Sequence, residues 1–218
     1  MALNFDQEIF VIKNFLSESE IKELKSAIKD SRDPVSGGAS EMNFWSRVNS
    51  NLKIPDSVMK KFHEVALEYG DKSLEFSAQT SFKYDPKYAS EDGLTQCPPH
   101  YDSGYKTQFS IDYQVESNVS WPLWVEGKKY VLDDNDALVF SGRSHMHWRD
   151  GQILNDGEFV DMYIMHFTEP GYEELDKSGK IKHFPQSSAE LASKLYNSNL
   201  KYKCLSINQY DHSMCDHN

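Results

Sequence analysis

Residues 107–115 read TQFSIDYQV, and the alternation within them decides the fold class of this chain. The odd-numbered residues from 109 to 115 are apolar or aromatic, and the even-numbered residues from 108 to 114 are polar. Successive side chains of a β-strand point to opposite faces of a sheet, so this alternation predicts a strand with one face in a hydrophobic core.

More short apolar stretches follow this strand, separated by turns that contain Gly, Asp or Asn. They are WPLWVEG (121–127), KKYVL (128–132), DALVFSG (136–142) and FVDMYIMHF (159–167). Several short strands joined by tight turns are typical of β-sandwiches and barrels. We therefore predict an α+β fold that is mainly β, with an antiparallel β-roll as its core.

The first 70 residues predict two helices. Ser17 and Glu20 form the S-x-x-E pattern of a capping box, after the extended apolar segment 8–16, and helical spacing of apolar residues continues to about residue 29. A second helix is expected over 57–69. We expect both helices to brace one sheet of the β-roll.

The boundaries of these helices carry further predictions. Asp56 or Ser57 is expected to cap the second helix, and Gly70 is expected to end it. Residues 31–40 are loop-like in composition. Residues 186–203 also have a helical pattern, and the tail from residue 204 is expected to be poorly ordered.

The 218 residues suit one domain, which we divide into a helical and strand support (1–75), a β-roll core (76–168) and a C-terminal extension (169–218). The net charge of −11 and pI near 5.1 disfavour a nucleic-acid partner, because phosphate contacts need clustered Lys and Arg. Three widely spaced cysteines do not form a disulfide framework. The start lacks a signal-peptide pattern and no apolar run suits a membrane span, so we expect a cytoplasmic protein without a membrane partner.

His100-Tyr101-Asp102 is the central chemical feature of the sequence. On an extended strand, residues i and i+2 point to the same face, so an imidazole and a carboxylate can reach one metal ion. One such triplet is weak on its own, because chance readily yields it in a chain with eight histidines.

A second histidine-bearing segment strengthens the case. SGRSHMHWRD (141–150) follows after several strand-like stretches, and a β-roll brings distant strands together. Two histidines and one carboxylate leave adjacent coordination positions open, which is diagnostic of non-haem iron(II) enzymes that activate oxygen. Both His145 and His147 can supply the second imidazole on this reasoning.

In the order of its motifs, the chain resembles the iron(II)/2-oxoglutarate dioxygenases, nearest to their prolyl 4-hydroxylase-like branch. The similar stretches are IFVIKNFLSESEIKEL (9–24), SFKYDPKY and PPHYD within 81–102, and DNDALVFSGRSHMHWRD (134–150). The resemblance covers roughly residues 8–168. It implies a double-stranded β-helix (jelly-roll) core and selects the histidine before Trp-Arg, so the implied catalytic and metal-binding residues are His100, Asp102 and His147.

The resemblance also implies bound iron(II) and 2-oxoglutarate, with ascorbate as a candidate reductant. In most of the family an Arg or Lys at the start of the last core strand binds the far carboxylate of 2-oxoglutarate. This chain departs from that pattern, because residues 151–168 contain neither Arg nor Lys. Arg149 is the best replacement, with a structural salt bridge to Asp150 or to an edge carboxylate as its alternative. Tyr84 matches the family's tyrosine that hydrogen-bonds 2-oxoglutarate. Arg143 and Lys106 are weaker candidates.

The implied reaction is hydroxylation of a C–H bond in a peptide or small molecule, with O2 as co-reactant. Two alternatives remain open on the sequence: a cupin-like metal-dependent dioxygenase or isomerase that does not use 2-oxoglutarate, and a non-catalytic β-roll binding module. The 15 residues of 85–99 are expected to form a long connection that acts as a lid. His166 is expected in the barrel interior near the metal rather than as a ligand.

Overall fold

The fold is described from a computed structural model, which describes residues 9–32, 39–42, 47–50, 52–70, 73–89, 93–100, 102 and 108–171. Its strands are β1 (Phe10–Ile12), β2 (Ala39–Met42), β3 (Arg47–Ser50), β4 (Glu75–Tyr84), β5 (Leu94–His100), β6 (Phe109–Ser117), β7 (Leu123–Val125), β8 (Lys128–Tyr130), β9 (Ala137–Phe140), β10 (His147–Ile153) and β11 (Val160–Thr168).

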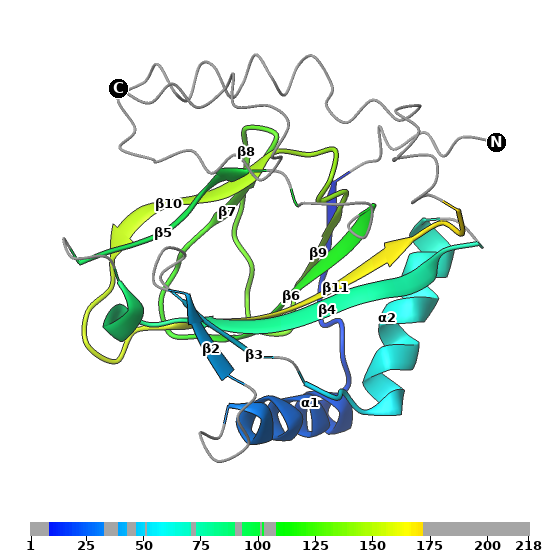
Figure 1. The fold of residues 1–218 in the computed structure, drawn as a ribbon, viewed down its shortest axis with the longest axis horizontal. Coiled ribbons are helices and arrows are strands. Elements are labelled where there is room, and N and C mark those ends of the chain that lie inside the picture. Colours follow the sequence, from blue (N-terminus) through cyan, green and yellow to red (C-terminus); the bar gives the residue numbers. More distant parts are fainter. Residues whose placement is uncertain are drawn as a thin grey trace.

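These strands form two antiparallel sheets that face each other (Figure 1). The larger sheet has the order β1-β9-β6-β11-β4-β3-β2, and the smaller has the order β5-β10-β7-β8. Non-consecutive strands are neighbours in both sheets, as a jelly-roll requires. The predicted mainly-β jelly-roll is confirmed.

Strand β6 shows how the two faces of the large sheet divide their roles. Its apolar residues Phe109, Ile111 and Tyr113 join the core cluster that includes the helices. The polar residues Ser110 and Asp112 are also buried, because their face of the sheet looks toward the smaller sheet rather than toward solvent. The predicted alternation is therefore correct, and it separates a packing face from an interior polar face.

Two helices, α1 (Glu18–Ser31) and α2 (Asp56–Tyr69), pack on the outer face of the large sheet (Figure 1). Both were predicted to brace one sheet, and this is confirmed. The capping box of α1 is present: Ser17 Oγ accepts from the backbone N–H of Glu20, and the Glu20 carboxylate accepts from the N–H of Ser17 at 2.8 Å. This pairing satisfies backbone donors that the first helical turn leaves open.

The N-terminus of α2 differs from its prediction. The cap residue is Pro55, which makes no side-chain cap bond, so capping by Asp56 or Ser57 was wrong. Ser57 already lies inside the helix and donates instead to Glu23 of α1 at 2.7 Å. Gly70 ends α2 as predicted.

The long connection over 85–99 was also predicted incorrectly. Pro86–Tyr88 form a short 3₁₀ helix, and residues from 94 onward form β5, which pairs with β10. Pairing satisfies the backbone of these residues, so only part of the segment is loop. Within 31–40, residues 39 and 40 begin β2 rather than continuing a loop.

Other predictions lie outside the described residues, including the helix over 186–203, the tail from 204 and Lys106. The division of the chain at residues 75 and 168 stays a prediction. No helix in the described part of the chain is long and apolar enough to cross a bilayer.

Candidate active site

Pairing of β5 with β10 brings the two predicted histidines together. His100 is the last residue of β5, His147 is the first of β10, and they are direct partners in the antiparallel register. Directly opposed side chains of neighbouring strands lie on one face of the sheet. The two imidazole rings are consequently 4.1 Å apart between centroids, and both are buried.

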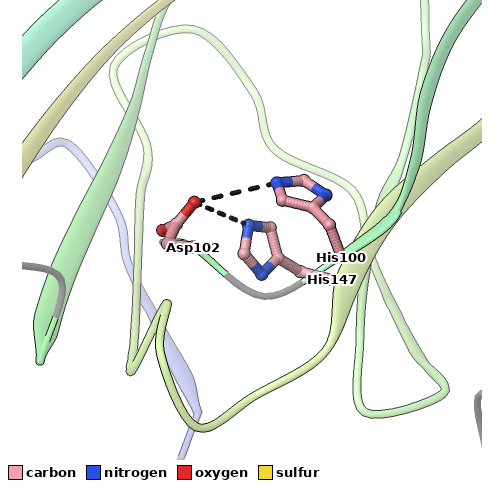
Figure 2. Close-up of side chains that lie close together, drawn as sticks. All are labelled: His100, Asp102 and His147. Atoms are coloured by element: carbon pink, nitrogen blue, oxygen red, sulfur yellow. Dashed lines mark ion pairs between the residues drawn. The ribbon is translucent and has the colours of Figure 1, made fainter. Parts of the chain in front are cut away.

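Asp102 completes the cluster from just beyond the end of β5. Its Oδ1 lies 3.7 Å from Nε2 of His100 and 3.6 Å from Nε2 of His147, as Figure 2 shows. One ligand atom from each of the three residues lies within 4.8 Å of the others. The backbone N–H of Asp102 donates to the carbonyl of Gly142 at 2.8 Å, which fixes the chain where it leaves the strand.

Gly142 makes this approach sterically possible. A Cβ at this position would overlap Asp102 Oδ2 and would stand 2.8 Å from Ser110 Oγ, so the Asp102 carboxylate would have to move. Gly142 therefore serves the site through its missing side chain, a role that the sequence analysis did not identify.

The electrostatics of the cluster pair the carboxylate with His147. Burial alone would raise the pKa of Asp102, but the surrounding histidines, His147 foremost, hold it well below its usual range. Burial opposes a positive charge on His147, but Asp102 outweighs this effect and raises the pKa of His147. The Asp102 carboxylate and the His147 imidazole therefore each favour the charged form of the other.

His147 rather than His145 belongs to the cluster. The Nδ1–H of His147 donates to the backbone carbonyl of His145 at 3.0 Å, which leaves Nε2 directed at Asp102. The Nδ1 of His145 accepts instead from the backbone N–H of Ser141 at 3.1 Å, within the turn that precedes β10. The structure therefore groups His147, rather than His145, with His100 and Asp102.

His166 and Ser110 extend the site on the large sheet. Ser110 Oγ accepts from the Gly142 N–H at 3.2 Å and lies 2.8 Å from His166 Nδ1. Burial lowers the pKa of His166 and keeps it neutral, and the ring lines the cavity as predicted.

The cavity between the sheets has a volume of about 480 Å3, counting its open mouth. The smaller sheet contributes His100, His147 and Arg149 to its wall, and the larger contributes Tyr84 and Asp112 among others. The candidate metal ligands, Tyr84 and Arg149 therefore share one cavity. Asp112 is a further cavity-lining residue that the sequence analysis did not single out.

Arg149 is the cation of this cavity. It is only 2% exposed, and its guanidinium donates to the backbone carbonyl of Trp121 and to Met162 Sδ at 3.5 Å. Within the described residues Arg149 makes no ion pair, so the salt bridge to Asp150 that competed with a binding role is not formed. Burial lowers the pKa of Arg149, while Tyr84, Cys97 and Asp112 act in the opposite direction. An arginine buried without a carboxylate partner is suited to bind an anion.

Tyr84 lies at the same end of the cavity. It is buried, and its ring packs edge-on against Trp121 with centroids 4.8 Å apart. Arg143 is buried as well but does not line the cavity. The geometry therefore favours Arg149 over Arg143.

The donor set fits a divalent metal. Two imidazole nitrogens and one carboxylate oxygen converge from one side, and the cavity opens on the other. This set suits non-haem iron(II) better than a closed structural zinc site, which would need a fourth protein ligand.

Comparison with known proteins places the fold. No protein-family model and no curated protein matches the chain by sequence. Among solved structures, a Trichoplax adhaerens prolyl hydroxylase in complex with a hypoxia inducible factor peptide fragment matches with a TM-score of 0.54 and 13% identity, over 77% of this chain and 86% of that one.

Two bacterial enzymes give similar agreement. A Pseudomonas putida prolyl-4-hydroxylase matches with a TM-score of 0.52 and 13% identity, over 76% of this chain and 94% of that one. HygX from Streptomyces hygroscopicus, solved with nickel, 2-oxoglutarate and hygromycin B, matches with a TM-score of 0.52 and 8% identity, over 76% and 85% of the two chains. The chain therefore shares the jelly-roll fold of these three solved structures.

Replacing Gly142 with Ala is expected to displace the Asp102 carboxylate and weaken metal binding by at least about tenfold, in line with loss of groups that orient metal ligands. Iron(II) affinity, measured anaerobically, checks this. Ser144→Ala, in the same turn, is the matched control. Equal iron(II) affinity in Gly142→Ala and the control would contradict the assigned role of Gly142.

Metal affinity is expected to depend on pH through His147. A metal ligand must be the neutral imidazole, and Asp102 raises the pKa of His147 above its ordinary value of 6.5. Affinity should therefore begin to fall at a pH above 6.5 as the pH is lowered, and continue to fall about tenfold per pH unit below the pKa of His147. Manganese(II) affinity measured over pH 8 to 6 tests this, and a decline that starts only below pH 6.5 would argue against the His147–Asp102 pairing.

Proposed function

We propose that this protein is a non-haem iron(II), 2-oxoglutarate-dependent oxygenase that hydroxylates a C–H bond of a peptide or small-molecule substrate. The observation that carries the proposal is the union, in one cavity, of the three converging ligands with a buried arginine that makes no ion pair with a described residue. The jelly-roll comparisons support it, since HygX was solved with nickel and 2-oxoglutarate.

Each residue has a role in this proposal. His100, Asp102 and His147 hold the iron, with the imidazole of His147 fixed by its bond to the carbonyl of His145. Arg149 binds the far carboxylate of 2-oxoglutarate, and Tyr84 lies beside it in the same cavity wall. When bound, iron and 2-oxoglutarate supply the oxidation, in which O2 hydroxylates the substrate while 2-oxoglutarate is converted to succinate and CO2.

The remaining contribution of the protein is to shape and dry the cavity. Its walls combine a few polar groups with apolar side chains such as Phe82, Leu123 and Ile164. Such a lining orients a charged cosubstrate and keeps bulk water away from the reacting atoms. No observation on the described residues favours the cupin-like or the non-catalytic alternative.

Anaerobic titration of the iron(II)-loaded protein with 2-oxoglutarate tests the proposal. The expected result is a weak visible charge-transfer band that saturates, together with loss of iron binding in His100→Ala and Asp102→Ala. Iron binding without the band would rule out the cosubstrate and favour the cupin-like reading. Unchanged iron content in the two variants would rule out the ligand set.

Replacing Arg149 with Met is expected to weaken 2-oxoglutarate binding by roughly 100-fold or more while leaving iron binding in place, because one partner of a buried charge pair is lost. Arg143→Met is the matched control, since Arg143 is also buried but does not line the cavity. Comparing the affinities by titration decides the assignment. A loss confined to Arg143→Met would transfer the role to that residue.

A further inference from the structure

The groups that hold the buried Arg149 are neutral, and most of them belong to Trp121. Its Nη1 donates to the backbone carbonyl of Trp121, and its guanidinium carbon stands 5.2 Å from the centroid of the Trp121 ring. A guanidinium over an aromatic face is attracted by the negative charge density of the ring, and the attraction is strongest where water is excluded. Trp121 is 5% exposed, so the contact is shielded.

The indole is itself fixed to the strand that carries Arg149. Trp121 Nε1–H donates to the backbone carbonyl of Asp150 at 2.7 Å, and the edge-on Tyr84 ring packs against it. One residue thus contacts the guanidinium through its carbonyl and ring and anchors to the next backbone position on β10. The indole does not line the cavity, so any effect on a ligand passes through Arg149.

The nature of these contacts matters for binding. A carboxylate that held Arg149 would neutralise it and compete with a carboxylate ligand. A carbonyl and an aromatic face hold the guanidinium in place and leave its charge available. Arg149 comes from β10, and its contact with Met162 shows that its guanidinium reaches the early part of the last strand, β11, from across the interior.

We propose that Trp121 is a positioning residue that orients Arg149 toward the far carboxylate of the cosubstrate, and so sets the preference for a dicarboxylate over a monocarboxylate 2-oxo acid. This rests on the proposed function, in which Arg149 binds 2-oxoglutarate. Trp121 is not one of the metal-binding residues, so its effect is confined to the far carboxylate of the bound 2-oxo acid.

The test compares two ligands on nickel(II)-loaded protein by calorimetry, without turnover. 2-Oxoglutarate carries the far carboxylate, and pyruvate presents only the 2-oxo acid. In Trp121→Leu the affinity for 2-oxoglutarate is expected to fall about tenfold, the range of a desolvated cation–π contact, while the affinity for pyruvate is unchanged. Trp121→Phe keeps a ring but loses the indole N–H, and its affinity for 2-oxoglutarate is expected to fall about threefold.

Trp148→Leu is the matched control. Trp148 is equally buried on β10 and also donates to Asp150, to Oδ1 at 3.1 Å, but it stacks on Trp124 rather than on Arg149. Its ratio of 2-oxoglutarate to pyruvate affinity is expected to match that of the wild type.

Several results would overturn the proposal. They are an unchanged ratio of 2-oxoglutarate to pyruvate affinity in Trp121→Leu, an equal loss of affinity for both compounds in that variant, or the same change of the ratio in Trp148→Leu. Should Trp121→Leu fail to fold, the ratio in Trp121→Phe decides on the same terms. A wild-type protein that binds pyruvate but shows no gain for 2-oxoglutarate would overturn the proposed cosubstrate itself, which separates that failure from a failure of the role of Trp121.

Discussion

The antiparallel pairing of β5 with β10 is the constraint on which the rest of the site depends. Its register sets His100 opposite His147, although 46 residues separate them along the chain. After a register shift between His147 and Arg149, Arg149 pairs with Cys97, so the metal-facing and anion-facing residues of the cavity share one pair of strands. A shift of either strand by one residue would turn its histidine away from the interior and separate the two imidazoles, because side-chain direction alternates along a strand.

The two faces of the large sheet have different roles. Outside, its aromatic residues pack against α1 and α2, and Phe62 of α2 stands edge-on to both Tyr113 and Tyr163. Inside, the alternate residues Ser110 and Asp112 line or support the cavity. Apolar burial between the helices and the outer face stabilises the sheet. The sheet can therefore carry polar residues on its inner face.

The cavity wall carries both a negatively charged group and a positively charged group. Within the cluster of candidate metal ligands, Asp102 is surrounded by histidines and stays ionised, which suits it to bind a cation. In the same cavity, the hydrogen bonds of Arg149 to described residues go to neutral groups, which leaves its charge available for an anion. A ligand that chelates a metal at one end and carries a carboxylate at the other matches both ends, which is the chemical reason for proposing 2-oxoglutarate.

The sequence by itself determined the strand alternation over 107–115, the capping box at Ser17, and the three ligand types, because these features are encoded in local spacing. It misjudged the cap of α2 and the loop over 85–99, where Pro55 and pairing with β10 override composition. The family resemblance selected His147 over His145, and the tertiary structure brings His147 to His100 and Asp102, whereas His145 lies in the turn before β10. The roles of Gly142, Ser110 and Trp121 required the tertiary structure, because each acts on a residue far away in the sequence and such contacts follow from strand pairing rather than from local pattern.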